Sequence, residues 1–235
     1  MARILICGDS HIPFVRSGYL QFLKDLRKEY RCDTILHIGD VVDSHSISFH
    51  EHHPELPNSL DEYKQAFETV KEWKAAFPKM LVTIGNHDSR IIRLANSVNI
   101  PSQMIKTYQE IWGTKNWNWQ WSFDVDNIHF VHGHNSGGGL WPAYNMMRKT
   151  AQSCVCGHYH SAAGLKYLVN HNARLFGLDV GAGCNDGQLA FAYNQFNAIR
   201  SVMSAAVILD GVPYLEIMPI STGEKYFNKR RKNNG

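Results

Sequence analysis

Short apolar runs alternate with segments of helical periodicity along the first part of the chain. Residues 3–7, 34–38 and 80–84 are mainly apolar, which predicts buried strands. Residues 15–30 and 60–77 carry apolar side chains at helical spacing, so we expect helices between these strands. A chain in which strands and helices alternate in this way is typical of an α/β fold.

From residue 88 onwards the predicted elements are shorter and mostly extended. Short helices are expected over residues 88–96 and 142–152. Residues 117–123 alternate aromatic and polar side chains, and Asp126-Asn127 separates them from the apolar run 128–131, so we expect a hairpin here. Further apolar runs predict strands at residues 154–156, 165–169, 175–180, 203–209 and 212–218.

The composition indicates a globular chain with one domain. Of its 235 residues, 44% are hydrophobic and 19% are charged, so the chain can bury a core of its own. Residues 224–235 hold five cationic side chains and one anionic one, so the formal charge of +3 becomes −1 for residues 1–223. We predict a single domain over 1–223, without a global basic surface, and a disordered basic tail over 224–235.

The sequence contains no signal for a membrane or for export. No apolar run approaches the ~18 residues that a membrane span needs. The apolar stretch at residues 4–7 is too short for a signal peptide, and the odd number of cysteines, 5, suggests no disulfide framework. We therefore expect a cytoplasmic protein that acts away from membranes, and nothing in the sequence implies an obligate protein partner.

Side chains that can bind metals follow five of the apolar runs directly. Glycine ends four of these runs, at Gly8, Gly39, Gly85 and Gly157. The side chains that follow the five runs are Asp9 and His11, Asp40, Asn86 to Asp88, His132 and His134, and His158 and His160. The carboxyl ends of parallel strands meet at one edge of a sheet, where ligand crevices form. Nitrogen and oxygen ligands without thiolate suit Mn, Fe, Co, Ni or Zn better than Ca or Mg. Seven of these side chains, namely Asp9, His11, Asp40, Asn86, His132, His158 and His160, are candidate ligands, and seven ligands suggest two ions that share a carboxylate.

The charge of such a centre favours an anionic substrate. Two divalent ions, balanced by Asp9, Asp40 and one hydroxide, leave a net charge of about +1. A phosphate group fits this charge.

The ordered set of motifs resembles the calcineurin-like metallophosphoesterase superfamily. Asp-x-His, Gly-Asp-x-x-Asp, Gly-Asn-His-Asp, His-Gly-His and Gly-His-x-His occur in this order between residues 9 and 160. The resemblance implies a four-layer α/β/β/α sandwich with a dimetal site at the C-terminal ends of the strands. Within the superfamily, the chain looks most like small stand-alone members, including those carried by phages.

The resemblance also implies a role for each motif residue. The implied ligands are Asp9, His11 and His160 for one ion, Asn86, His132 and His158 for the other, and Asp40 as the bridge between them. Two divalent transition-metal ions are expected, with Mn²⁺ favoured and Fe, Zn, Ni or Co as alternatives. His87 would assist the leaving group, and Asp88 would orient His87 by a hydrogen bond.

Among the activities of the superfamily, the sequence favours a phosphodiesterase. The serine/threonine protein phosphatases have Arg-Gly where this chain has Ser44-His45, and purple acid phosphatases have a Tyr in the block that here contains Val41 and Val42. The expected reaction is attack of a metal-bridging hydroxide on a phosphodiester of a nucleotide or nucleic acid. Two alternatives stay open: a phosphomonoesterase for a small phosphorylated metabolite, and a non-catalytic scaffold that binds a partner through the tryptophans of residues 117–121.

Overall fold

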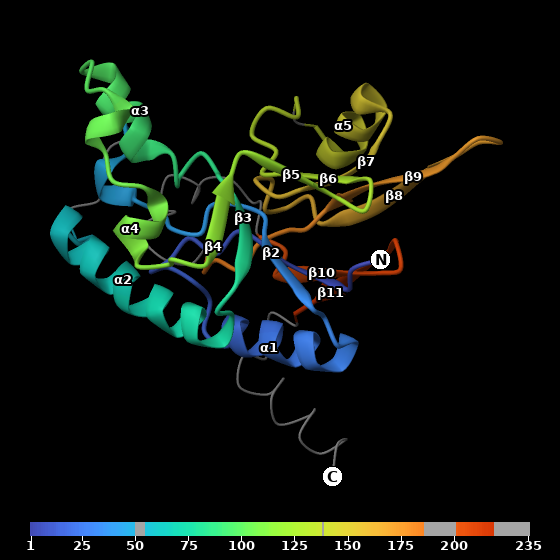
Figure 1. Ribbon diagram of the computed structural model, residues 1–235, viewed down its shortest axis with the longest axis horizontal. Coiled ribbons are helices and arrows are strands. Elements are labelled where there is room, and N and C mark those ends of the chain that lie inside the picture. Colours follow the sequence, from blue (N-terminus) through green and yellow to red (C-terminus); the bar gives the residue numbers. More distant parts are fainter. Residues whose placement is uncertain (50–54, 138, 186–200, 219–235) are drawn as a thin grey trace, which may run out of the picture.

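Six strands form the first of two sheets in the structure, a computed structural model that describes residues 1–49, 55–137, 139–185 and 201–218. The strand order is β11-β10-β1-β2-β3-β4 (Figure 1), with β1 to β4 parallel and β10 and β11 antiparallel to their neighbours. The bounds are β1 Ile4–Cys7, β2 Thr34–His37, β3 Met80–Thr83, β4 Trp117–Gln120, β10 Ser204–Leu209 and β11 Val212–Ile217. Because proline cannot donate to a strand ladder, Pro213 is suited to the edge strand β11.

The second sheet has five strands in the order β5-β6-β7-β9-β8. Their bounds are β5 Ser122–Val125, β6 Ile128–Val131, β7 Ser153–Cys156, β8 Gly164–Val169 and β9 Arg174–Asp179. Strands β6, β7 and β9 run parallel, and β5 and β8 are antiparallel to their partners. The carboxyl ends of β6 and β7 therefore lie at the same edge of this sheet.

Helices cover the outer face of each sheet (Figure 1). The α-helices are α1 Tyr19–Tyr30, α2 Ser59–Ala76, α3 Arg90–Ser97, α4 Tyr108–Trp112 and α5 Pro142–Thr150, and the 3-10 helices are η1 His45–Ile47 and η2 Ser102–Met104. The side chain of Asn58 caps α2 by accepting hydrogen bonds from two backbone amides. A capping box formed by Thr107 and Glu110 starts α4, a helix that the apolar pattern did not reveal.

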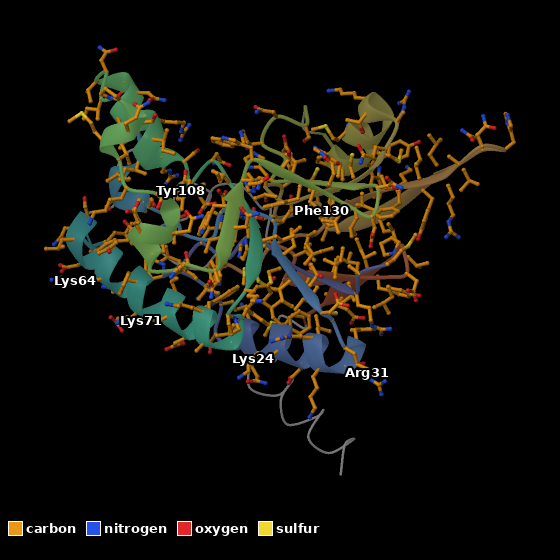
Figure 2. The ribbon with its side chains drawn as sticks, in the orientation of Figure 1. Lys24, Arg31, Lys64, Lys71, Tyr108 and Phe130 are labelled. Carbon is orange, nitrogen blue, oxygen red and sulfur yellow. The ribbon has the colours of Figure 1, made fainter. Side chains whose placement is uncertain are left out.

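The core consists of two apolar layers and gives the fold its four-layer order. Residues of α1 and α2, such as Phe22 and Trp73, pack on one face of the first sheet. Between the sheets lies a second cluster that includes Leu36 from the first sheet and Phe130, labelled in Figure 2, from the second. Helix α5 packs on the far side of the second sheet, where a Cβ at Gly177 would lie only 2.4 Å from the backbone nitrogen of Tyr144. The α/β/β/α sandwich expected from the sequence is confirmed.

The expected hairpin over residues 117–131 is wrong in its first half. Strand β4, which includes Trp117 and Trp119, pairs with β3 in the first sheet, and only β5 and β6 form a hairpin. The two tryptophans are buried in the core beneath the helices, whereas Phe123 is buried between the sheets. The chain therefore changes sheets at Trp121, which is 54% exposed. The period-two pattern marks strands correctly but does not indicate which sheet each one joins.

Two further expectations concern the chain as a whole. Of the helices in the described ranges, none is both long and apolar enough to cross a membrane. The single domain over 1–223 stays a prediction, and the tail at 224–235 lies outside the described residues.

We predict that Tyr19→Phe destabilises the fold without removing any ring packing. The buried hydroxyl of Tyr19 accepts a hydrogen bond from the amide of Gly8 at 2.9 Å and donates one to the carbonyl of Ser204 at 2.7 Å. Because the substitution leaves both buried backbone groups without this partner, the free energy of unfolding should fall by about 1–3 kcal/mol in urea denaturation.

Tyr63→Phe is the matched control for this measurement. The hydroxyl of Tyr63 also donates to a backbone carbonyl, that of Ile111, but its side chain is 39% exposed. Water can replace this bond, so we expect a change below about 1 kcal/mol. Equal destabilisation by the two variants would contradict the role assigned to Tyr19.

Candidate dimetal site

The metal-capable residues predicted from the sequence converge where five loops meet. These loops follow β1, β2, β3, β6 and β7 at the carboxyl ends of the strands. Because β1 to β4 are parallel, the arrowhead of β4 in Figure 1 shows the direction of their carboxyl ends, which face the region between α3 and α5.

Three residues of the cluster, His11, Asp40 and His158, have positive φ angles of 47°, 49° and 68°. Such left-handed conformations are uncommon for residues other than glycine and concentrate at functional sites.

Asp9, His11 and His160 form the first group of donors. Their ligand atoms lie within 4.8 Å of one another. The Nε2 atom of His160 is 3.2 Å from Oδ2 of Asp9 and 3.1 Å from Nε2 of His11. This is the group that the resemblance assigned to one ion.

Asp40, His132 and His158 form the second group, with Asn86 beside them. The ligand atoms of the three titratable residues again lie within 4.8 Å of one another. The Nε2 atom of His132 is 3.1 Å from Oδ2 of Asp40 and 2.9 Å from Oδ1 of Asn86. Asp40 also reaches the first group, since its Oδ2 is 3.7 Å from Nε2 of His11. The structure thus brings all seven predicted ligands together, with Asp40 between the two groups.

Two features of the donor groups fit bound cations. The Oδ1 atom of Asp9 is buried and has no hydrogen-bond partner among the described residues. A buried carboxylate oxygen is costly without a proton donor or a cation beside it. In addition, His11 and His160 direct their Nε2 atoms at each other, as ligands of one ion would. The mixed set of imidazole, carboxylate and amide donors suits divalent transition metals.

The electrostatics of the cluster favour positive charge. Burial alone would disfavour the charged carboxylate of Asp40, but His132 and His87 outweigh burial and hold its pKa well below the usual range. Conversely, burial would lower the pKa of His132, yet Asp40 and Asp9 raise this pKa to about 9. A pocket that stabilises imidazolium in this way also stabilises a divalent ion, which competes with protons for the same nitrogens.

Backbone contacts hold the donors in place. The Nδ1 atom of His132 donates to the carbonyl of Ile38 at 2.9 Å, so Nε2, which is directed into the cluster, is the nitrogen that would give up its proton to a metal ion. The amide of His158 donates to Oδ2 of Asp9 at 2.8 Å. Gly85 allows β3 to approach Asp40, because a Cβ at this position would lie 2.0 Å from Oδ1 of Asp40.

His87 lies beside the donor groups and contacts Asp43 and Arg90. Its backbone amide donates to Oδ1 of Asp40 at 2.8 Å, and its Nδ1 atom is 3.0 Å from Oδ1 of Asp43. Arg90 donates to the carbonyls of Asp43 and Ser44 at 2.8 and 3.0 Å and is 3.3 Å from Nε2 of His87. Burial opposes the charged ring, but Asp40 and Asp43 raise the pKa of His87.

The expected hydrogen bond between Asp88 and His87 is not what the structure shows. The carboxylate of Asp88 accepts hydrogen bonds from the amides of Val42 and Gly85 at 3.2 and 2.9 Å. Asp43 faces His87 instead and also binds Nδ1 of His11 at 2.6 Å. Asp88 is adjacent to His87 in sequence, but its side chain turns back towards the loops after β2 and β3 and fixes them to each other.

Two residues near the centre were assigned no role there by the sequence pattern. These residues are Asp43 and Arg90. Both are buried, with exposures of 1% and 7%. The spacing of Gly-Asp-x-x-Asp was the available signal for Asp43, and the position of Arg90 three residues after His87 was the signal for Arg90.

A family model and one solved structure agree with this architecture. A family model described as calcineurin-like phosphoesterase matches residues 2–162. Vps29 of Chaetomium thermophilum is 12% identical over 94% of this chain and 93% of its own, with a TM-score of 0.50, which supports the fold alone. A metallophosphoesterase from Sphaerobacter thermophilus is 15% identical over 99% of this chain and 94% of its own, with a TM-score of 0.47. No curated protein matches the chain in sequence.

We predict that substitution of a donor residue lowers the metal content of the protein, whereas substitution of His87 does not. Asp40→Ala and Asn86→Ala should lower the amount of Mn²⁺ that the protein retains after gel filtration, because each removes a ligand atom from the cluster. His87→Ala should retain metal at the wild-type level. The measurement is elemental analysis of the reconstituted protein, and metal loss in His87→Ala equal to that in Asp40→Ala would contradict the assignment.

Proposed function

Because the family match spans more than half of its length, the chain belongs to the calcineurin-like phosphoesterase family, and we propose that it is a dimetal phosphodiesterase acting on a nucleotide or a nucleic acid. The observation that carries the proposal is the position of Asp40. Its carboxylate lies between two groups of donors, and the amide of His87 donates to the same carboxylate. This arrangement can present one phosphate group to two ions and to an acid at the same time.

The proposal assigns seven residues to the two ions. Asp9, His11 and His160 would bind one, His132, His158 and Asn86 the other, and Asp40 both. When bound, two divalent ions polarise a phosphoryl oxygen and lower the pKa of water near them. We propose transition metals with Mn²⁺ as the first candidate, in line with the nitrogen-rich donor set.

His87 would serve the leaving group. Its Nδ1 atom is held by Asp43, so Nε2 is the atom that can give a proton to the departing oxygen. The raised pKa favours the protonated ring, because Asp40 and Asp43 stabilise its charge against burial. Arg90 lies beside the ring and donates to the carbonyl of Asp43, so that the ring has little rotamer freedom left to lose on binding.

The charges around the centre support a diester over a monoester. Asp43 adds a third buried carboxylate to Asp9 and Asp40, and the pKa of Asp43 is lowered, since hydrogen bonds from His11 and His87 outweigh its burial. The guanidinium of Arg90 is occupied by backbone carbonyls and His87. A site with this little surplus of positive charge matches a singly charged phosphodiester better than a doubly charged monoester.

The alternative of a scaffold that binds through a tryptophan stripe is not supported. Trp117 and Trp119 are only 1% and 8% exposed and belong to the core. Trp121, at 54%, is the one exposed tryptophan of the three, so they form no stripe on the surface. The phosphomonoesterase alternative is left to experiment.

We predict that bis-p-nitrophenyl phosphate is hydrolysed by the protein reconstituted with Mn²⁺ and that His87→Ala lowers kcat by ~10²–10⁴-fold. This is the usual size of a general acid's contribution. The comparison substrate is p-nitrophenyl phosphate, which has one ester bond fewer. His129→Ala is the matched control, because His129 contacts Asp124 on the surface of the second sheet and should have no effect on kcat.

Two outcomes would contradict the proposal. Turnover of the monoester alone would establish the phosphomonoesterase instead. Absence of turnover in a protein that retains no metal would favour a binding function for the fold.

A further inference from the structure

A cavity of about 360 Å³ lies between the loop that follows β6 and helix α5. It is lined by Ser136, Gly137, Asn145, Arg148 and Lys149. The first two residues come from the loop that begins with the metal-binding His132, and the others come from α5. None of the five is among the predicted metal ligands or the residues around His87. The cavity therefore needs an explanation of its own.

The charge of this cavity is positive. Arg148 and Lys149 are exposed and lie in the last turn of α5, and within the described ranges neither forms an ion pair with a carboxylate. Lys149 reaches across to the loop, since its Nζ atom would lie 3.4 Å from a Cβ at Gly137. Two cationic side chains that converge without an anionic partner favour an anionic ligand.

Ser136 provides a second, independent indication of a ligand. The residue is fully buried, and within the part of the chain that the structure describes its Oγ atom has no hydrogen-bond partner. A buried hydroxyl that makes no hydrogen bond is unfavourable and rare in folded proteins. An acceptor oxygen in the cavity would take the proton of this hydroxyl.

The cavity lies within reach of a substrate bound at the metal site. Ser136 is four residues from His132, so even an extended chain would separate them by at most about 14 Å. His134 lies between them in sequence, and its ring centroid is 5.7 Å from that of His132 and 6.3 Å from that of His158. The loop is also compact, because the amide of Ser136 donates to the carbonyl of Gly133. One ligand can therefore span both places.

We propose that this cavity binds a second phosphate group of the substrate, held by Arg148, Lys149 and the hydroxyl of Ser136. The inference rests on the proposed phosphodiesterase function and narrows it. The favoured substrate then carries at least two phosphates, as a short oligonucleotide does, and the cavity sets its position relative to the bond that is cleaved.

The first test measures binding alone. The metal-free full chain is titrated with inorganic phosphate at low ionic strength and followed by ³¹P nuclear magnetic resonance. We expect saturable binding that is weakened at least about 10-fold in the double variant Arg148→Ala/Lys149→Ala, because charge-assisted hydrogen bonds are lost. Ser136→Ala should weaken binding by a smaller factor while changing the side chain by a single atom.

The matched control is Lys64→Ala/Lys79→Ala, which removes the same charge from exposed positions. Lys64, which is labelled in Figure 2, lies on α2, on the side of the molecule away from α5. This variant should bind phosphate as the wild type does. Absence of saturable binding in the wild type, or equal weakening in both double variants, would overturn the proposal.

The second test uses turnover and separates this proposal from the function on which it rests. With the Mn²⁺-loaded enzyme, a trinucleotide with two phosphodiesters should have a KM about 10-fold below that of a dinucleoside monophosphate with one. The double variant at Arg148 and Lys149 should lose this difference, and the control at Lys64 and Lys79 should keep it. A difference that persists in the first variant overturns the second phosphate site, whereas a wild type that cleaves neither substrate overturns the phosphodiesterase itself.

Discussion

The carboxylate of Asp40 is buried between side chains from both sheets, and the geometry of the site depends on how it is held. Its Oδ1 atom accepts a hydrogen bond from the amide of His87, and its Oδ2 atom lies 3.1 Å from Nε2 of His132. Its own carbonyl accepts hydrogen bonds from the amides of Ser10 and His11. Loops that follow β1, β3 and β6 are thus fixed relative to one residue after β2. The left-handed backbone of Asp40, with φ of 49°, is maintained by these contacts.

This arrangement places negative charge in the interior of the protein. Asp9, Asp40 and Asp43 are all at most 1% exposed and lie close together. Such a group is stable only if positive charge accompanies it, since isolated buried carboxylates are strongly unfavourable. Imidazoles surround all three carboxylates, and bound cations would complete the balance. The same need explains why the site is suited to divalent ions and why His87 has a raised pKa.

Much of the fold and of the candidate site could be predicted from the sequence, because both depend on local patterns. Strands such as β1 and β2 are short apolar runs, and the donors follow them at fixed spacing, so their convergence follows from parallel topology. The sheet that β4 joins could not be predicted, because burial of Trp117 and Phe123 in different layers is a tertiary property. The orientation of Asp88 away from His87 depends on which loop amides need an acceptor. The cavity at Ser136 arises from packing of α5 against the loop that precedes it, which no sequence pattern indicates.

The most direct test of the dimetal centre is anomalous X-ray scattering from crystals of the Mn²⁺-loaded protein. We expect two anomalous peaks on either side of Asp40. One should lie beside Asp9, His11 and His160, and the other beside Asn86, His132 and His158. A single peak, or peaks away from these side chains, would contradict a dimetal centre built on Asp40.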